Sequence, residues 1–169
     1  MIIEIHRALP EDEPVLRHLM QLYLYDRSEF EGTDVDDHGS FGYDWLGHYW
    51  IEDGRYPFLV RVGGKIAGFA LVRQLEQNGT PDREPLHEIT DLFILRRFRR
   101  RGVGRVLARR MFDMFPGRWS VREREVNAPA HAFWRSVVTE YTRGHFEEKR
   151  ERSETFRGMI QRFHSRQPQ

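Results

Sequence analysis

Apolar residues in the first half of the chain follow two kinds of spacing. After Pro10 and the acids behind it, helical spacing predicts the first helix. Its apolar positions are Val15, Leu16, Leu19, Leu22 and Tyr23. Short apolar runs predict strands at residues 2–5, 58–62 and 66–72. Gly63-Gly64 predicts a tight hairpin between the last two strands. Between 25 and 53 neither spacing persists, so we expect one shorter helix there, flanked by loops.

The second half alternates strand and helix patterns. The polar stretch 74–85 predicts a loop, the apolar stripe within 102–115 predicts a helix, and Pro129 suits the first turn of another helix. The predicted strands are residues 89–95, 119–126, 142–149 and 155–163. The sequence therefore predicts a mixed α/β (α+β) sheet of about seven strands with about four helices, in one domain spanning residues 1–169.

Composition is typical of a folded globular domain, with 39% hydrophobic and 31% charged residues. The absence of cysteine excludes disulfides, thiolate metal sites and a cysteine nucleophile. No apolar run reaches the roughly 18 residues of a membrane span, and the first residues do not resemble a signal peptide. We therefore expect a cytoplasmic protein with no membrane partner.

Positive charge is concentrated in one segment although the net charge is only +1. Arginines there are Arg96, Arg97, Arg99, Arg100, Arg101, Arg105, Arg109 and Arg110. The acids lie largely elsewhere, so the segment favours a local anion as partner over a nucleic acid.

The run from Arg99 to Gly104, Arg-Arg-Arg-Gly-Val-Gly, lies where a predicted strand ends and a predicted helix begins. The first turn of a helix has unpaired N–H groups and a positive dipole end, and together these bind anions. Gly102 and Gly104 let phosphate oxygens approach the backbone. The alternative interpretation is a solvated basic turn whose glycines serve geometry alone.

Two blocks of sequence resemble motifs of the GNAT family, the GCN5-related N-acetyltransferases. The first is Asp-Leu-Phe-Ile-Leu at 91–95 with Phe98-Arg99 and Gly102-Val103-Gly104, and the second is Asn-Ala-Pro-Ala-His-Ala-Phe-Trp at 127–134. The resemblance implies a single-domain GNAT-like fold, with a splayed and mostly antiparallel sheet. Its acyl-CoA-binding core would span about residues 87–138, with acetyl-CoA as co-substrate.

The resemblance also implies roles for residues of both blocks. The backbone of Leu92, Phe93 and Ile94 would pair with the pantetheine amides, and Asn127 would bond to the same arm or line its channel. The pyrophosphate would be held mainly by main-chain N–H groups. Residues of this cradle are Arg99, Arg100, Arg101, Gly102, Val103, Gly104 and Arg105. Ala130, Phe133 and Trp134 would lie near the thioester. Arg96, Arg97 and Arg109 are alternatives for the 3′-phosphate.

Acetyl transfer to an amine requires a base, because an ammonium group has no lone pair. Glu88 is the first choice, since some family members carry a catalytic glutamate at this offset. Asp91 is the alternative, although it points to the opposite strand face unless a bulge shifts the register. Trp134 stands where many relatives have tyrosine as proton donor, and an indole cannot take that role. His131 and Tyr141 are weaker alternatives.

The acceptor in this family is selected by the early helices and the segment after them. Tyr23, Tyr25 and Asp26 are the predicted substrate-binding residues. Acids beside aromatics between 23 and 50 favour a small amine or a peptide amine.

The other histidines show no metal-ligand spacing, so no metal is expected. Members of this family often form homodimers, so the resemblance allows a homodimer here. A non-catalytic acyl-CoA sensor and, less favoured, a nucleic-acid-binding module are the alternative functions.

Overall fold

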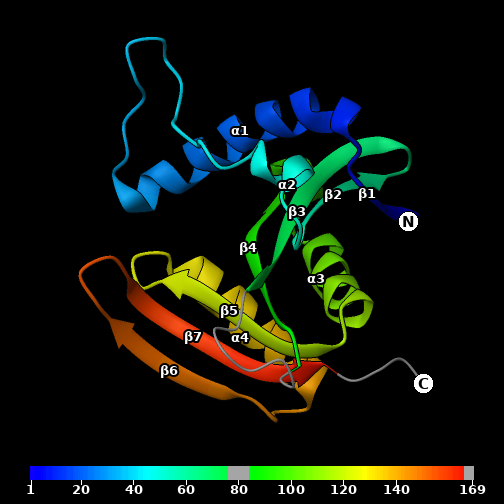
Figure 1. Ribbon diagram of the computed structural model, residues 1–169, viewed down its shortest axis with the longest axis vertical. Coiled ribbons are helices and arrows are strands. Elements are labelled where there is room, and N and C mark those ends of the chain that lie inside the picture. Colours follow the sequence, from blue (N-terminus) through cyan, green and yellow to red (C-terminus); the bar gives the residue numbers. More distant parts are fainter. Residues whose placement is uncertain (76–83, 166–169) are drawn as a thin grey trace.

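The computed structural model describes residues 1–75 and 84–165, which form a seven-stranded sheet ordered β1-β2-β3-β4-β5-β7-β6 (Figure 1). The strands are β1 (Ile3–Arg7), β2 (Arg55–Val62), β3 (Lys65–Leu75), β4 (Leu86–Ile94), β5 (Gly117–Arg124), β6 (Glu147–Arg152) and β7 (Arg157–Ser165). All neighbours are antiparallel except β4 and β5, which are parallel. The mixed sheet and its seven strands confirm the fold class that the sequence predicts.

Helices cover both faces of the sheet. The α-helices are α1 (Glu13–Glu31), α2 (His48–Ile51), α3 (Val103–Met114) and α4 (Ala128–Thr142), and short 3-10 turns span Pro10–Asp12 and Arg96–Phe98. Helix α1 packs on β3 and α2 on β2, whereas α3 packs on β4, and α4 packs on β5 and β7. Buried apolar side chains accordingly form two clusters, one on each face.

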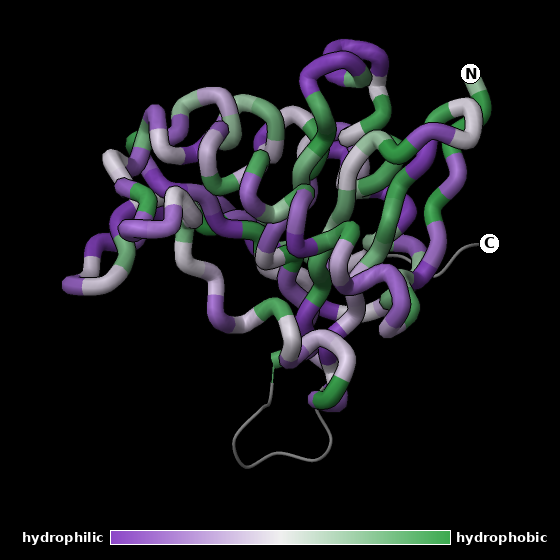
Figure 2. Tube along the Cα trace, turned by 90° about the horizontal axis from the view of Figure 1, so that it is seen from above, coloured by the Kyte–Doolittle hydropathy of each residue, from purple (hydrophilic) through white to green (hydrophobic). Residues whose placement is uncertain are grey.

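Strand alternation divides the side chains of β3 between these two clusters. Phe69 and Leu71 belong to the cluster under α1 and α2, whereas Ala70 and Val72 belong to the cluster under α3 and α4. Figure 2 shows hydrophobic positions along the central strands and largely hydrophilic positions on the outer loops. Among the described residues, no helix is both long and apolar enough to cross a membrane.

Strands β4 and β5 part along their length. Parallel pairing joins them only from Leu86 with Arg118 to Glu88 with Ser120, although both strands continue. Beyond that point β4 pairs with β3 alone and β5 with β7 alone, and the two strands diverge (Figure 1). The splay therefore leaves one edge of β4 at residues 91–94 without a neighbouring strand.

Several predicted boundaries were wrong. Helix α1 does not break down near residue 25 but continues to Glu31, because its last turns are held by polar pairs such as Arg27 with Glu31. The strand expected at 142–149 begins only at Glu147, because α4 continues through Thr142 before its end. Within the loop expected at 74–85, Gln74 and Leu75 end β3, and residues 76–83 lie outside the described residues.

Candidate functional site

The start of α3 lies beside the end of β4, where a Cβ added at Gly104 would be 3.6 Å from Ile94 Cγ1. Arg100 and Gly102 both have positive φ angles, 60° and 80°, which turn the chain sharply between the 3-10 turn and the helix. The first helical bond runs from Val106 N to Gly102 O at 3.0 Å. The N–H groups of Val103, Gly104 and Arg105 therefore precede any intrahelical partner, as the predicted anion cradle requires.

The side chain of Arg99 points away from this cradle and into the protein. Its Nε donates to Ile94 O at 2.7 Å, and its Nη2 donates to Asp26 Oδ2 at 2.5 Å. Arg96 Nη2 donates to the other oxygen of Asp26 at 2.8 Å. Partial burial alone would raise the pKa of Asp26, but the hydrogen bonds from Arg96 and Arg99 bring it below its usual value. Asp26 thus links α1 to the turn after β4.

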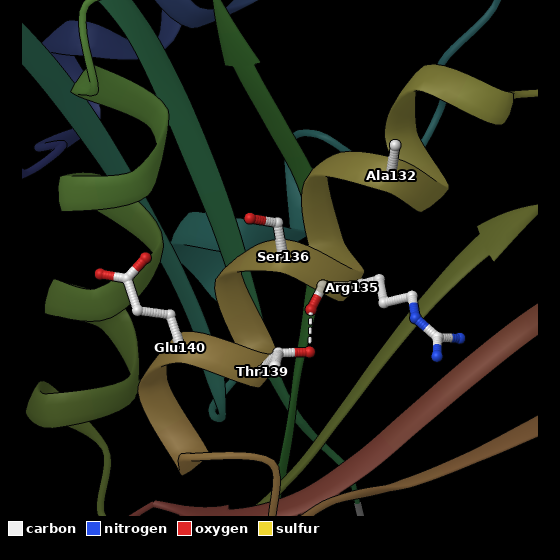
Figure 3. Close-up of a pocket in the computed structure, with 5 residues that line it drawn as sticks. All are labelled: Ala132, Arg135, Ser136, Thr139 and Glu140. Atoms are coloured by element: carbon white, nitrogen blue, oxygen red, sulfur yellow. Dashed lines mark hydrogen bonds between the residues drawn. The ribbon is translucent and has the colours of Figure 1, made fainter.

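The arginines on the outer face of α3 bind α4. Arg105 donates to Ser136 Oγ at 3.0 Å and pairs with Glu140, and Arg109 reaches the same carboxylate at 3.1 Å. A depression of about 420 Å³ lies on this face of α4 (Figure 3). Its lining residues are Ala132, Arg135, Ser136, Thr139 and Glu140. Among the described residues, Arg100 and Arg101 have no ion-pair partner, so their charges remain available to an anion.

The beginning of α4 lies against the beginning of α3. Asn127 Oδ1 accepts a hydrogen bond from Ala130 N at 3.1 Å and caps the helix. The ring of Phe133 fills the space beside Gly104, where an added Cβ would lie 3.3 Å from Phe133 Cζ. Trp134 is only 8% exposed and packs edge-on against Phe133, with ring centroids 5.0 Å apart. Phe133 therefore lines the cradle, whereas Trp134 belongs to the core.

A β-bulge brings the two candidate bases to the same face of the sheet. Leu71 pairs with Asp91 but the next residue, Val72, pairs with Ile89, so Thr90 is an extra residue in β4. Asp91 therefore lies opposite Leu71, and Glu88 lies opposite Arg73, on the side covered by α1 and α2. Without this bulge, Asp91 and Glu88 would point to opposite faces of the sheet.

Asp91 is buried in a network of hydroxyl and guanidinium groups. Tyr43 donates to Asp91 Oδ2 at 2.8 Å, and Arg27 Nη1 lies 3.6 Å from Asp91 Oδ1. Burial raises the pKa of Asp91, although these partners oppose the shift. Burial also raises the pKa of Tyr23, and the Asp91 charge adds to that shift. Because Tyr49 bonds to Thr90 Oγ1 at 2.7 Å, the network joins α1, α2 and the bulge.

Glu88 lies between two guanidinium groups at the point where β4 and β5 part. Arg73 Nη2 lies 3.0 Å from its Oε2, and Arg122 Nε lies 3.7 Å from its Oε1. The guanidinium of Arg122 also stacks over the ring of Phe156 at 4.9 Å. The carboxylate is therefore held by two cations beside the place where β4 loses its pairing with β5.

The structure separates the three residues predicted to bind substrate. Tyr23 packs against Phe69 and Phe93 in the core, Asp26 is paired with arginines, and the side chain of Tyr25 is 65% exposed.

Sequence reasoning missed Arg27, Arg73 and Arg122. The one available signal for Arg27 was its spacing of one helical turn from Tyr23.

The two alternative proton donors point elsewhere. His131 Nε2 lies 3.3 Å from Glu148 Oε2, on the face of the sheet opposite Glu88. Tyr141 donates to Asp113 Oδ1 at 2.8 Å and packs on Phe112 and Phe163. Neither side chain lies at the open edge of β4.

Residues 16–137 match the model of the family described as acetyltransferase (GNAT) family. No curated protein sequence matches the chain. Among solved structures, the ribosomal-protein-S18-alanine N-acetyltransferase from Escherichia coli is 16% identical, with a TM-score of 0.62 over 99% of this chain and 97% of that chain. An aminoglycoside acetyltransferase in complex with coenzyme A is 12% identical, with a TM-score of 0.64 over 96% and 95% of the two chains.

A third similar structure is an aminoglycoside acetyltransferase from an uncultured soil metagenomic sample in complex with sisomicin. It is 24% identical, with a TM-score of 0.56 over 80% of this chain and 86% of that chain. At these identities the structures establish a shared fold, whereas the family match covers most of the chain.

Proposed function

The chain belongs to the acetyltransferase (GNAT) family, and from this premise we propose that it moves an acetyl group from acetyl-CoA directly to a primary amine of a small molecule or peptide. One observation carries the proposal: the strandless edge of β4 at residues 91–94 leads to the unpaired N–H groups at the start of α3. An elongated ligand that has amides along one part and a pyrophosphate at its end fits this arrangement.

Different groups of the chain bind different parts of acetyl-CoA. The N–H groups of Val103, Gly104 and Arg105 receive the pyrophosphate, and the free guanidinium groups of Arg100 and Arg101 add charge. The open edge of β4 at Leu92–Ile94 pairs with the pantetheine amides, as a neighbouring strand would. Asn127 Nδ2 donates to the same arm while Oδ1 caps α4. Phe133 packs beside the cradle.

Catalysis then requires a base and an oxyanion donor on the same side of the splay. Glu88 takes a proton from the acceptor ammonium, directly or through water, and the amine nitrogen attacks the thioester carbonyl carbon. Backbone N–H groups of β4 donate to the developing oxyanion. The attacking nitrogen then loses its second proton to water, and the carbon–sulfur bond breaks as the amide forms. The leaving thiolate is protonated from water, because the indole of Trp134 is no acid. Asp91 has a structural role in holding Tyr43 and Arg27.

The charges near α1 favour a cationic amine as the acceptor. The segment after α1 carries Asp34, Asp36, Asp37 and Asp44, all exposed. This segment projects from the end of α1 (Figure 1). Its negative charge attracts ammonium groups toward the α1 side of the sheet. Two of the similar structures are aminoglycoside acetyltransferases, whose named substrates carry amines. A non-catalytic acyl-CoA sensor is the second candidate, favoured by the burial of Trp134 in the core.

Release of free thiol from acetyl-CoA across a panel of small amines, aminoglycosides and peptide N-termini tests the proposal. We expect turnover with at least one cationic amine. Glu88→Gln should lower kcat by about 10²–10⁴-fold, the contribution of a general base. Glu4→Gln, an exposed strand glutamate on β1, is the matched control and should leave kcat unchanged.

Three outcomes separate the candidates. Turnover that Glu88→Gln abolishes supports acetyl transfer with Glu88 as base. Acetyl-CoA binding with no turnover for any amine supports the sensor. Turnover that is unchanged in Glu88→Gln but lost in Asp91→Asn, with the thermal midpoint preserved, would transfer the role of base to Asp91.

A further inference from the structure

A second group of chemically active side chains lies beneath α4, on the opposite face of the sheet from Glu88. It comprises Glu123 of β5, His131 of α4 and Glu148 of β6, and their nearest ligating atoms all lie within 4.8 Å of one another. His131 Nε2 lies 3.3 Å from Glu148 Oε2 and 3.9 Å from Glu123 Oε1. Ligands bound to Zn²⁺ at about 2.0–2.2 Å lie about 3–4 Å apart, so these positions need only small side-chain shifts.

Gln161 of β7 forms the floor of this cluster. Its side chain is fully buried, and its amide nitrogen lies 2.6 Å from Glu123 Oε1 and 2.7 Å from Glu148 Oε2. Among the described residues, Gln161 Oε1 and Glu123 Oε2 have no hydrogen-bond partner although both atoms are buried. A buried polar atom without a partner is costly. The amide nitrogen of Gln161 now faces the two carboxylates. Rotating the amide by half a turn exchanges its oxygen and nitrogen, so the oxygen would face a cation bound between the carboxylates in place of these two hydrogen bonds.

The charges of the cluster also favour a cation. Glu123 is 5% exposed, and its one ion-pair partner among the described residues is His131, which is cationic only when protonated. Arg135 pairs with Glu148 but does not reach Glu123. A buried carboxylate such as that of Glu123 requires compensation. A proton offers one form of it, because burial raises the pKa of Glu123 to about 8. A divalent ion offers another, and it also uses the imidazole and the amide oxygen.

We propose that Glu123, His131 and Glu148 bind one divalent transition-metal ion, with the amide oxygen of Gln161 as a further ligand. An imidazole with carboxylates suits zinc and its first-row neighbours, whereas magnesium and calcium prefer oxygen ligands alone. The ion joins α4 to β5 and β6 through His131, which lies four residues after the helix cap at Asn127. Its role is structural, and the proposal is independent of acetyl transfer.

Titration of chelator-treated full-length protein with ZnCl₂, followed by calorimetry and by the thermal midpoint, tests this site. We expect one equivalent of Zn²⁺ to bind and to raise the midpoint. His131→Gln and Glu123→Gln should each weaken binding at least tenfold, because each removes a direct ligand. His6→Gln and Glu4→Gln, exposed substitutions on β1, are the matched controls and should bind like the wild type.

His131 is partly exposed, so His131→Gln should fold even if Glu123→Gln does not. Visible absorption of bound Co²⁺ gives a second measurement on the wild-type protein alone, and it should show a nitrogen–oxygen ligand set. The proposal is overturned if the wild type binds no Zn²⁺, if His131→Gln binds as tightly as the wild type, or if Mg²⁺ competes equally with Zn²⁺. The first of these results would leave a protonated Glu123 as the explanation of the cluster.

Discussion

Asn127 has two assigned tasks that substitutions can separate. Its Oδ1 accepts from Ala130 N at 3.1 Å and caps α4, whereas its Nδ2 is proposed to donate to the pantetheine arm. Loss of a helix cap costs about 1 kcal/mol, which for a domain of this size lowers the thermal midpoint by about 2–4 °C. Loss of one neutral hydrogen bond to the ligand also costs about 1 kcal/mol, or about a fivefold rise in Kd.

Two variants distinguish these tasks. Asn127→Ala removes both groups, so it should lower the midpoint by about 2–4 °C and raise the Kd for acetyl-CoA about fivefold. Asn127→Ser keeps a capping oxygen but lacks the amide, so it should raise the Kd by the same factor with the midpoint nearly unchanged. Scanning calorimetry and isothermal titration measure the two quantities, and Ala132→Ser, an exposed change on α4, controls for disturbance of the helix.

If Asn127→Ser binds acetyl-CoA like the wild type, Asn127 is only a cap and its role in the cofactor site is refuted. If Asn127→Ala leaves the midpoint unchanged, the capping bond contributes nothing to stability.

Three further substitutions test the packing around the site by urea unfolding. Asp26→Asn should cost about 1 kcal/mol at pH 7. Because the folded pKa of Asp26 is lowered from 3.8, this difference should be present above that pH and disappear as the pH falls below it; a difference that persists at low pH would contradict the pairing with Arg99. Gly68→Ala places a Cβ 1.9 Å from Phe93 O, so it should destabilise by about 3 kcal/mol or more, whereas Gly42→Ala, with open space around it, should be nearly neutral; equal midpoints for these two would refute the contact. Trp134→Ala should cost about 3–5 kcal/mol, and a smaller loss would argue against its place in the core.

Local patterns in the sequence were sufficient to predict the sheet and the glycine turn that precedes α3. Alternating apolar residues in β3 predict a strand because its two faces contact different helices. The glycine turn at Gly102 was recognisable because its backbone conformation and the helix start after it are both local features. These are the cases in which short-range physics decides the structure.

Features that depend on pairing across the fold were not predictable. The bulge at Thr90 arises from the register between β3 and β4, which the sequence of β4 alone does not specify. The charges on Arg99 and Arg105 looked equivalent to those on Arg100 and Arg101, but their partners Asp26 and Glu140 lie far away in sequence.

The cluster beneath α4 could not be recognised from the sequence for the same reason. Glu123, His131 and Glu148 come from three different elements and have no ligand spacing along the chain. Only the folded sheet brings them together.

The most direct test of the central claim is thermal unfolding of the wild-type protein with and without acetyl-CoA. A ligand at one hundred times its Kd that binds only the folded state stabilises it by about 2.7 kcal/mol, which corresponds to a rise of about 5–10 °C for a domain of this size. The account predicts such a rise. An unchanged midpoint at millimolar acetyl-CoA would contradict it, because the open edge of β4 and the start of α3 would then not form an acetyl-CoA site.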